Sequence, residues 1–149
     1  MHKPILLSIL ILALVASCVR VLNASAALEE VDVVVNKSNN PGPLSREEVR
    51  KIFMGEKSSW RGGKRITVLM LEANQPERAV ILREVFKMNE SDYTKYFLQA
   101  AFAGRVQAAP RDLPSAAQMK ARLTANPTAI GYLRKEDVDS SFNVVLRLP

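Results

Sequence analysis

The sequence is almost without cysteine and histidine. Cys18 is the only cysteine and His2 the only histidine among 149 residues. A single cysteine excludes an internal disulfide and the paired cysteines of redox or zinc motifs. Because no imidazole follows His2, Ser-His-Asp and Cys-His catalysis and most zinc sites are also excluded. We therefore expect no enzyme, no metal and no cofactor, since the spacing shows no nucleophile–base pair, acidic cluster or paired carboxylate.

Aromatic residues are also scarce, at 6% of the chain, and they do not alternate with basic residues. Single-stranded nucleic acid needs such alternation, so nucleic acid is not an expected partner. The net charge of +6 is mild, with local concentrations of basic residues at 61–65 and 134–135. A charge of this size suits an anionic small ligand or an acidic partner surface, and it is equally usual for a solvated surface.

The N-terminus has the layout of an export signal. A short basic start precedes an apolar run at residues 5–16, which is too short for a comfortable membrane span. The small residues 24–26 predict cleavage after Ala26, which would make residues 1–26 a signal peptide and residues 27–149 the mature domain.

A lipid anchor is the alternative to a free domain. Residues 15–18 resemble a lipobox, in which Cys18 becomes the lipidated first residue of a bacterial lipoprotein and residues 1–17 are removed. Both alternatives predict a periplasmic or otherwise exported domain, and only the second attaches it to a membrane.

Strand and helix patterns alternate in the rest of the chain. Residues 31–36 are β-branched and apolar, which is typical of a strand buried on both faces. Ser45 and Glu48 form a capping-box pattern, which opens a helix whose apolar stripe is Val49, Ile52 and Phe53. Gly55 is the expected end of that helix.

The second half of the chain continues the alternation. It predicts a strand at residues 65–71, a helix from Pro76 to about residue 88, and a helix from about residue 91 to Gly104. The apolar stripes expected on these two helices are Ala79, Leu82, Val85 and Phe86, and then Tyr93, Phe97, Leu98 and Ala101. A loop is predicted at residues 106–114, a helix from Ser115 to about residue 125, and strands at 129–133 and 142–148. The pattern is that of an α/β domain with a small, at least partly parallel sheet.

Two motifs are the most specific ones in the chain: IFMG at residues 52–55 followed by Trp60, and NPTAIGY at residues 126–132. With the sequence around them, they resemble the phosphate-binding-protein-like family of periplasmic solute-binding domains, the receptors of phosphate uptake systems. The resemblance implies a single (second) lobe of a periplasmic-binding-protein-like, type II fold, with a small mixed sheet flanked by helices. It also implies structural roles for Phe53, Gly55, Trp60, Gly131 and Tyr132.

The resemblance places a ligand site after the strand at residues 65–71. Family members have an arginine and Ser-Gly-Thr at the following helix start, where hydroxyls and backbone N–H groups hold phosphate. This sequence instead reads LEANQPER at residues 71–78, without the hydroxyls. The residues that remain for an anionic or polar ligand are Asn74, Gln75 and Arg78. On this hypothesis, Arg78→Ala weakens anion binding without unfolding the domain.

Ser38 and Asn39 form a second candidate pair, because they follow the first strand at its carboxyl end, where ligands of open α/β sheets often bind. Their residue types are equally usual in turns.

Two functions remain open from the sequence. The first is an exported domain that binds phosphate or a related small anionic ligand, as part of an ABC uptake or sensing system. Its expected partners are an ABC permease, a second lobe or a second copy of the chain. The alternative is an envelope interaction module that has kept the lobe and lost the ligand.

Overall fold

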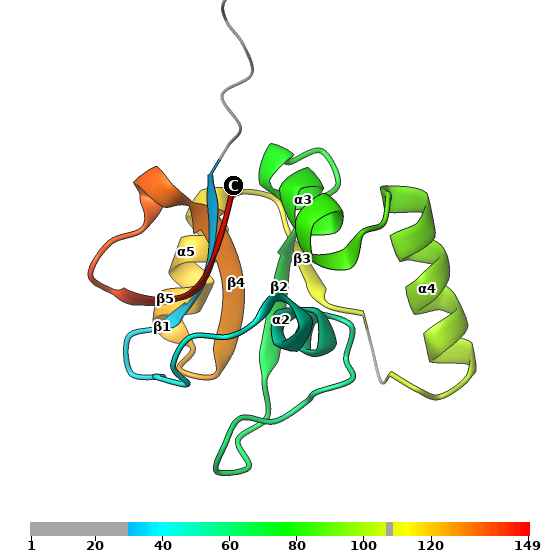
Figure 1. The fold of residues 1–149 in the computed structure, drawn as a ribbon, viewed down its shortest axis with the longest axis horizontal. Helices are drawn as coiled ribbons and strands as arrows, with labels where there is room; N and C mark the ends of the chain where they lie inside the picture. Colours follow the sequence, from blue (N-terminus) through cyan, green and yellow to red (C-terminus); the bar gives the residue numbers. More distant parts are fainter. Residues whose placement is uncertain (1–29, 107–108) are drawn as a thin grey trace, which may run out of the picture.

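Five strands form one sheet in the computed structural model, which describes residues 30–106 and 109–149 (Figure 1). The proposed signal peptide and Cys18 lie outside the described residues. The strand order is β3-β2-β4-β1-β5. The strands are β1 (Val31–Asn36), β2 (Thr67–Leu71), β3 (Arg111–Leu113), β4 (Ala129–Arg134) and β5 (Phe142–Leu148). The helical elements are α2 (Arg46–Phe53), α3 (Pro76–Ile81), the π-helical turn η1 (Leu82–Phe86), α4 (Glu90–Phe102), α5 (Ala116–Ala125) and the 3₁₀ turn η2 (Lys135–Asp137).

Strand direction divides the sheet into two halves. β2 runs parallel to β3 and β4, whereas β1 is antiparallel to β4 and β5. The predicted mixed α/β sheet is therefore confirmed. Ile130 of β4 lies opposite Val35 near the end of β1 and opposite Val68 near the start of β2. The carboxyl ends of β1 and β2 consequently point in opposite directions along the sheet (Figure 1).

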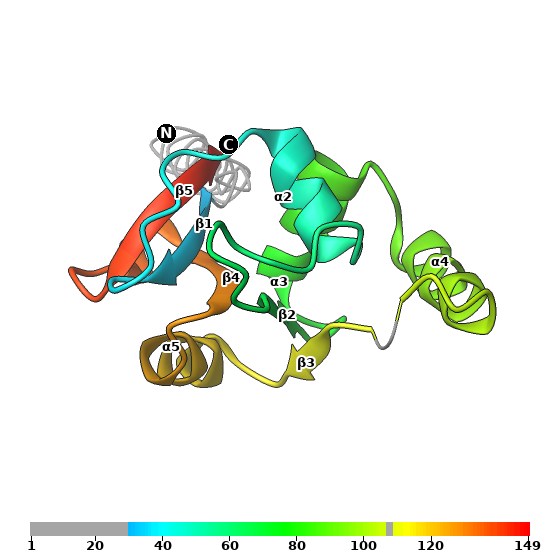
Figure 2. The same cartoon turned by 90° about the horizontal axis from the view of Figure 1, so that it is seen from below.

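Helices cover both faces of the sheet. α5 lies on one face, and α2 and α3 lie on the other (Figure 2). Every residue of β1 is buried, as predicted for a strand covered on both sides. Phe53 of α2 packs against Phe86 and Tyr132, with ring centroids 6.2 and 6.3 Å apart. The Tyr132 hydroxyl accepts a hydrogen bond from the backbone N–H of Leu71 at 2.8 Å, which joins β4 to the end of β2.

Local signals set the ends of α2 as predicted. Ser45 Oγ accepts from the Glu48 N–H at 3.1 Å, and a Glu48 carboxylate oxygen accepts from the Ser45 N–H at 2.9 Å. This reciprocal pair satisfies two N–H groups that the first turn leaves unpaired. Val49, Ile52 and Phe53 are buried. The chain then leaves the helix through Gly55, whose φ of +78° favours glycine.

The helix after β2 differs from its prediction. The sequence predicts a regular α-helix with Ala79 on its apolar side, but Ala79 is exposed and Val80 and Ile81 are buried. These three residues belong to α3, and the π-helical turn η1 follows them, with Leu82, Val85 and Phe86 buried as predicted.

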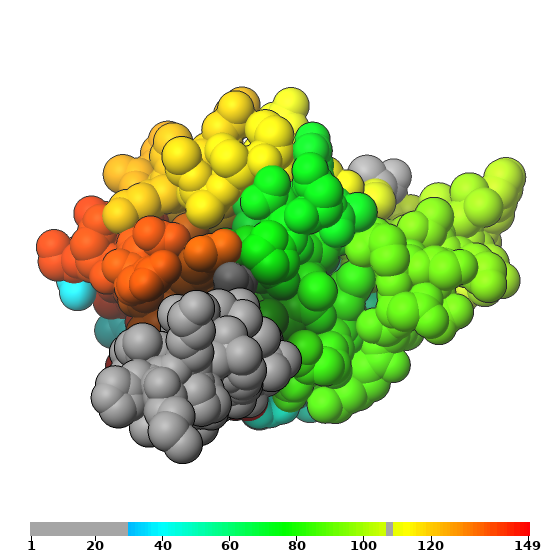
Figure 3. Space-filling view, turned by 90° about the horizontal axis from the view of Figure 1, so that it is seen from above, coloured from blue at the N-terminus to red at the C-terminus, as the bar shows by residue number. Residues whose placement is uncertain are grey.

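Two further predictions are wrong. The segment at residues 106–114 contains β3, which pairs in parallel with β2 through Leu69 and Arg111. A strand of three residues is too short for a local sequence pattern to reveal. On α4, Tyr93 and Phe97 are buried as predicted, whereas Leu98 and Ala101 are exposed because α4 touches the body along a narrow stripe. α4 projects from the side of the molecule (Figure 3).

Among the described residues, no helix combines the length and the apolar character that crossing a membrane requires.

Candidate functional site

Arg78 lies inside the protein, in a cluster that joins three segments. Its side chain makes four hydrogen bonds: to Leu71 O at 2.6 Å, to Asp112 at 2.9 Å, and to both carboxylate oxygens of Glu90 at 3.0 and 2.6 Å. Its guanidinium carbon also lies 4.9 Å from the centre of the Tyr93 ring. The Arg78 residue is 3% exposed. A guanidinium has five N–H donors, so internal partners occupy most of this one's capacity.

The electrostatics of the cluster favour its own ion pairs. Burial alone would lower the pKa of Arg78, but the hydrogen bonds to Glu90 and the charge of Asp112 outweigh it and raise this pKa above its ordinary value. Burial also raises the pKa of Tyr93. The guanidinium therefore stays charged, and two carboxylates neutralise it.

The other two predicted ligand residues lie beside this cluster. The Gln75 side chain donates to Pro114 O at 2.9 Å and makes no capping hydrogen bond to α3. Asn74 is exposed. Glu77, in the first turn of α3, is buried and pairs with Arg134 at 2.5 Å. Glu77, Glu90 and Asp112 thus place three carboxylates beside the start of α3, each paired with an arginine. The role of Asn74, Gln75 and Arg78 as ligand residues stays a prediction.

Ser38 and Asn39, the second candidate pair, do not lie beside those residues, and their role as ligand residues stays a prediction. The carboxyl end of β1 points away from the carboxyl end of β2, because β1 is antiparallel to β4 and β2 is parallel to it. Ser38 donates twice to Asn36 Oδ1, at 2.9 and 2.7 Å, and Asn39 O accepts from Asn143 at 2.8 Å. These bonds are those of a turn.

The motif residues lie in or beside the core. Phe53 and Tyr132 are buried, and Trp60 is 8% exposed, with its indole N–H donating to Thr128 O at 3.0 Å. A Cβ added to Gly131 would lie 2.6 Å from Met119 Sδ, so β4 and α5 approach closely there.

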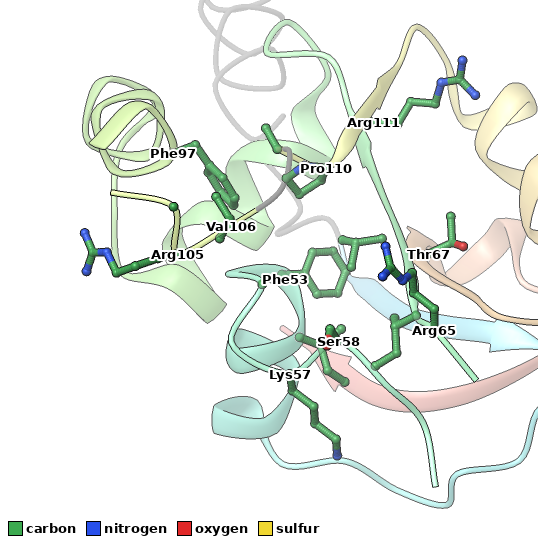
Figure 4. A pocket seen from close by; sticks show the side chains of 16 residues that line it. Phe53, Lys57, Ser58, Arg65, Thr67, Phe97, Arg105, Val106, Pro110 and Arg111 are labelled. Atoms are coloured by element: carbon green, nitrogen blue, oxygen red, sulfur yellow. The ribbon is translucent and has the colours of Figure 1, made fainter. Parts of the chain in front are cut away.

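A groove of about 580 Å³ lies near the amino end of β2 (Figure 4). Its walls come from the segment after α2, the start of β2, the end of α4 and the start of β3. The basic lining residues are Lys57, Arg65, Arg105 and Arg111, the hydroxyl residues are Ser58 and Thr67, and the apolar residues include Ile66, Val68, Phe97 and Val106. None of the described lining residues is acidic.

The cations of the groove differ from Arg78 in their partners. Among the described residues, Lys57, Arg105 and Arg111 form no ion pair. Lys57 is half-buried, and Arg65, Arg105 and Arg111 are exposed. In Figure 4, Arg65 extends toward Phe53, whereas Arg105 and Arg111 lie apart at the rim. Three of the four basic residues that line the groove therefore have no carboxylate partner among the described residues.

Sequence reasoning did not find this groove. The basic residues 61–65 and the end of α2 are visible as separate patterns, but neither one indicates a ligand site. Arg105 and Arg111 are distant in sequence, and only the pairing of β3 with β2 brings Arg111 to the same place.

Gly55→Ala is expected to lower the free energy of unfolding by about 1–2 kcal/mol, because an L-residue at φ +78° is strained. The new Cβ would also lie 2.8 Å from Val106 Cγ1, so the groove wall must move. Gly63→Ala is the matched control, since Gly63 has φ +82° and open space around it. Thermal unfolding of both variants measures the difference. Equal losses would contradict a contribution from the Val106 contact.

The described residues contain no group of three or more histidine, cysteine or acidic side chains arranged to hold a metal ion.

Solved structures show where this fold occurs. No protein-family model matches the sequence, and no curated protein matches it. One similar structure is a putative phosphate ABC transporter substrate-binding protein with bound phosphate from Clostridium perfringens, at TM-score 0.62 and 18% identity. A second is an ABC-type phosphate transport receptor from Vibrio cholerae, at TM-score 0.60 and 22% identity. A third is PstS from Borrelia burgdorferi, at TM-score 0.59 and 14% identity.

The extent of the match identifies the part of the fold that is present. Each comparison covers 77% of this chain but only 43%, 45% and 46% of the respective neighbour. The chain thus spans less than half the length of the proteins it resembles. Its fold is that of a single lobe of the phosphate-type solute-binding proteins.

Proposed function

We propose that this chain is an exported domain of the solute-binding type that binds a small anionic ligand, and that the ligand lies in the basic groove rather than at the start of α3. The observation that carries the proposal is the lining of the groove, with four basic residues and no acidic one among those described. A solute-binding role in an ABC uptake or sensing system agrees with the fold.

The two ends of β2 explain the choice of site. At the carboxyl end, Arg78 is held by Glu90 and Asp112, and an anion would have to displace both. At the amino end, Lys57, Arg105 and Arg111 form no ion pair among the described residues, so an anion would displace no carboxylate from them. The volume of about 580 Å³ is within the usual range for small-molecule sites. A single lobe cannot close over its ligand as two lobes do, so we expect modest affinity.

Binding of a panel of anions tests the proposal. The purified protein is titrated with inorganic phosphate, sulfate, benzoate and phenyl phosphate, and binding is followed by thermal shift and by the fluorescence of Trp60, the only tryptophan. At least one anion is expected to raise the melting temperature saturably, because a ligand of the native state stabilises it. The double variant Lys57→Gln and Arg111→Gln is expected to weaken that binding about tenfold.

The matched control is Lys37→Gln with Arg122→Gln, which changes the net charge equally at exposed positions outside the groove. Unchanged affinity in this control supports the groove. Equal losses in both double variants would mean that only the overall charge matters, and would contradict the site.

A second candidate, the envelope interaction module, is favoured by one feature of α4. Among the described residues, the large hydrophobic residues that are exposed are Leu98 and Phe102, with exposed fractions of 58% and 85%. They lie four residues apart on the projecting helix α4, so they share one of its faces (Figure 3). A flat response across the anion panel from a folded protein would favour this candidate over anion binding.

A further inference from the structure

We infer that the ligand of the groove is an amphiphilic anion: a soluble small molecule with one acidic group and an aromatic or aliphatic body. The inference rests on the proposed function, since it names the class of anion for the same groove. It differs from the binding of free inorganic phosphate in requiring the apolar part of the molecule.

The apolar wall is the first argument. Burial decreases along β2 toward its amino end, where Thr67 and Val68 are half-buried while residues 69–71 are fully buried. Val68 and Val106 are half-buried and pack against the core beneath them. Pro110 and the edge of Phe97 complete this side of the groove. A ligand without an apolar part would leave these side chains in contact with water, whereas an aromatic or aliphatic body would cover them.

The placement of the cations is the second argument. Lys57, Arg65, Arg105 and Arg111 come from four separate segments, and in Figure 4 their charged ends do not converge on one point. Phosphate sites use several donors aimed at one compact ion, often backbone N–H groups at a helix start. Here the charged ends are not arranged around one compact ion. A ligand whose body lies in the groove can place its acidic group against the rim and be held by both parts.

The hydroxyls give the site a polar interior. Ser58 and Thr67 line the groove beside Arg65. Thr67 Oγ1 lies 3.2 Å from Thr128 Oγ1, a hydrogen bond that fixes its orientation. Binding sites for small molecules usually combine a few fixed polar groups of this kind with mainly apolar walls.

A pair of dyes tests the inference directly. 8-Anilinonaphthalene-1-sulfonate carries an acidic group, and N-phenyl-1-naphthylamine has the same rings without it. The sulfonate dye is expected to bind saturably to the folded protein, at least fivefold more tightly than the neutral dye. Lys57→Gln with Arg111→Gln is expected to remove that preference and to leave binding of the neutral dye unchanged. Cooperative thermal unfolding of each variant excludes dye binding to an unfolded form.

Competition then identifies the ligand class. Phenyl phosphate is expected to displace the sulfonate dye at a concentration at least tenfold lower than inorganic phosphate. Val68→Thr keeps the shape of the side chain and replaces a methyl group with a hydroxyl. This variant is expected to bind phenyl phosphate severalfold more weakly and to bind inorganic phosphate with unchanged affinity. Vesicles of phosphatidylglycerol are the third competitor, because an acidic lipid has the same two chemical parts.

Each outcome has one meaning. Equal displacement by phenyl phosphate and inorganic phosphate would overturn this inference and leave anion binding in place. Displacement by vesicles alone would overturn the assignment to a soluble small molecule. Absence of binding by every anion would overturn the proposed function as well.

Discussion

Replacing Arg78 with alanine is expected to lower the free energy of unfolding by about 3 kcal/mol, because it leaves a cavity at a buried position and removes the hydrogen bonds of the guanidinium. The Arg78 side chain is 4% exposed and pairs with Glu90 and Asp112. Its loss would also leave Leu71 O without a donor that lies 2.6 Å away. This result would be opposite to the hypothesis that Arg78→Ala weakens anion binding and leaves folding unchanged.

Chemical denaturation of Arg78→Ala and of Arg83→Ala measures the effect. Arg83 is the matched control, since it is exposed and pairs only with its neighbour Glu84. Adding Glu90→Gln and Asp112→Asn to Arg78→Met is expected to recover part of the lost stability, because no unpaired charge then remains. If Arg78→Ala unfolds like Arg83→Ala and also loses anion affinity, Arg78 is a ligand residue after all.

Gly131→Val is expected to lower the free energy of unfolding by about 3 kcal/mol, because the site has no room for a side chain. A Cβ at Gly131 would lie 2.6 Å from Met119 Sδ and 3.4 Å from Leu123 Cδ1. Both neighbours on α5 are fully buried, so neither can move into solvent. The helix would have to shift away from β4, and chemical denaturation would detect the loss.

A double-mutant cycle identifies the cause of that loss. Met119→Ala alone creates a cavity and is destabilising, but it also opens space opposite residue 131. The double variant is therefore expected to be more stable than the sum of the two single losses predicts, with a coupling of about 1 kcal/mol. Additive losses would show that crowding against Met119 is not the reason.

Local patterns predicted most of the fold. The capping box at Ser45, the turn at Gly55 and the apolar strand at residues 31–36 are each encoded by a few neighbouring residues. The direction of β1, the existence of β3 and the π-helical turn were not predictable, because each depends on contacts between distant segments.

The candidate site shows the same division more sharply. Arg78 was correctly noticed as a basic residue at a helix start, but its partners Glu90 and Asp112 lie 12 and 34 residues away. Nothing near Arg78 in sequence indicates that they neutralise it. The groove combines segments in the same way, so the sequence shows a concentration of basic residues at 61–65 but not the groove to which Arg65 belongs.

The position of β1 also makes the sheet depend on contacts between the two ends of the described domain. β1 begins the described domain, yet its two neighbours in the sheet are the last two strands, β4 and β5. The first strand therefore has no strand partner until almost the whole chain is present, and closing this long loop slows folding. A chain that is still being synthesised cannot complete its sheet. β1 would keep one side without a partner until residues 142–148 have formed β5.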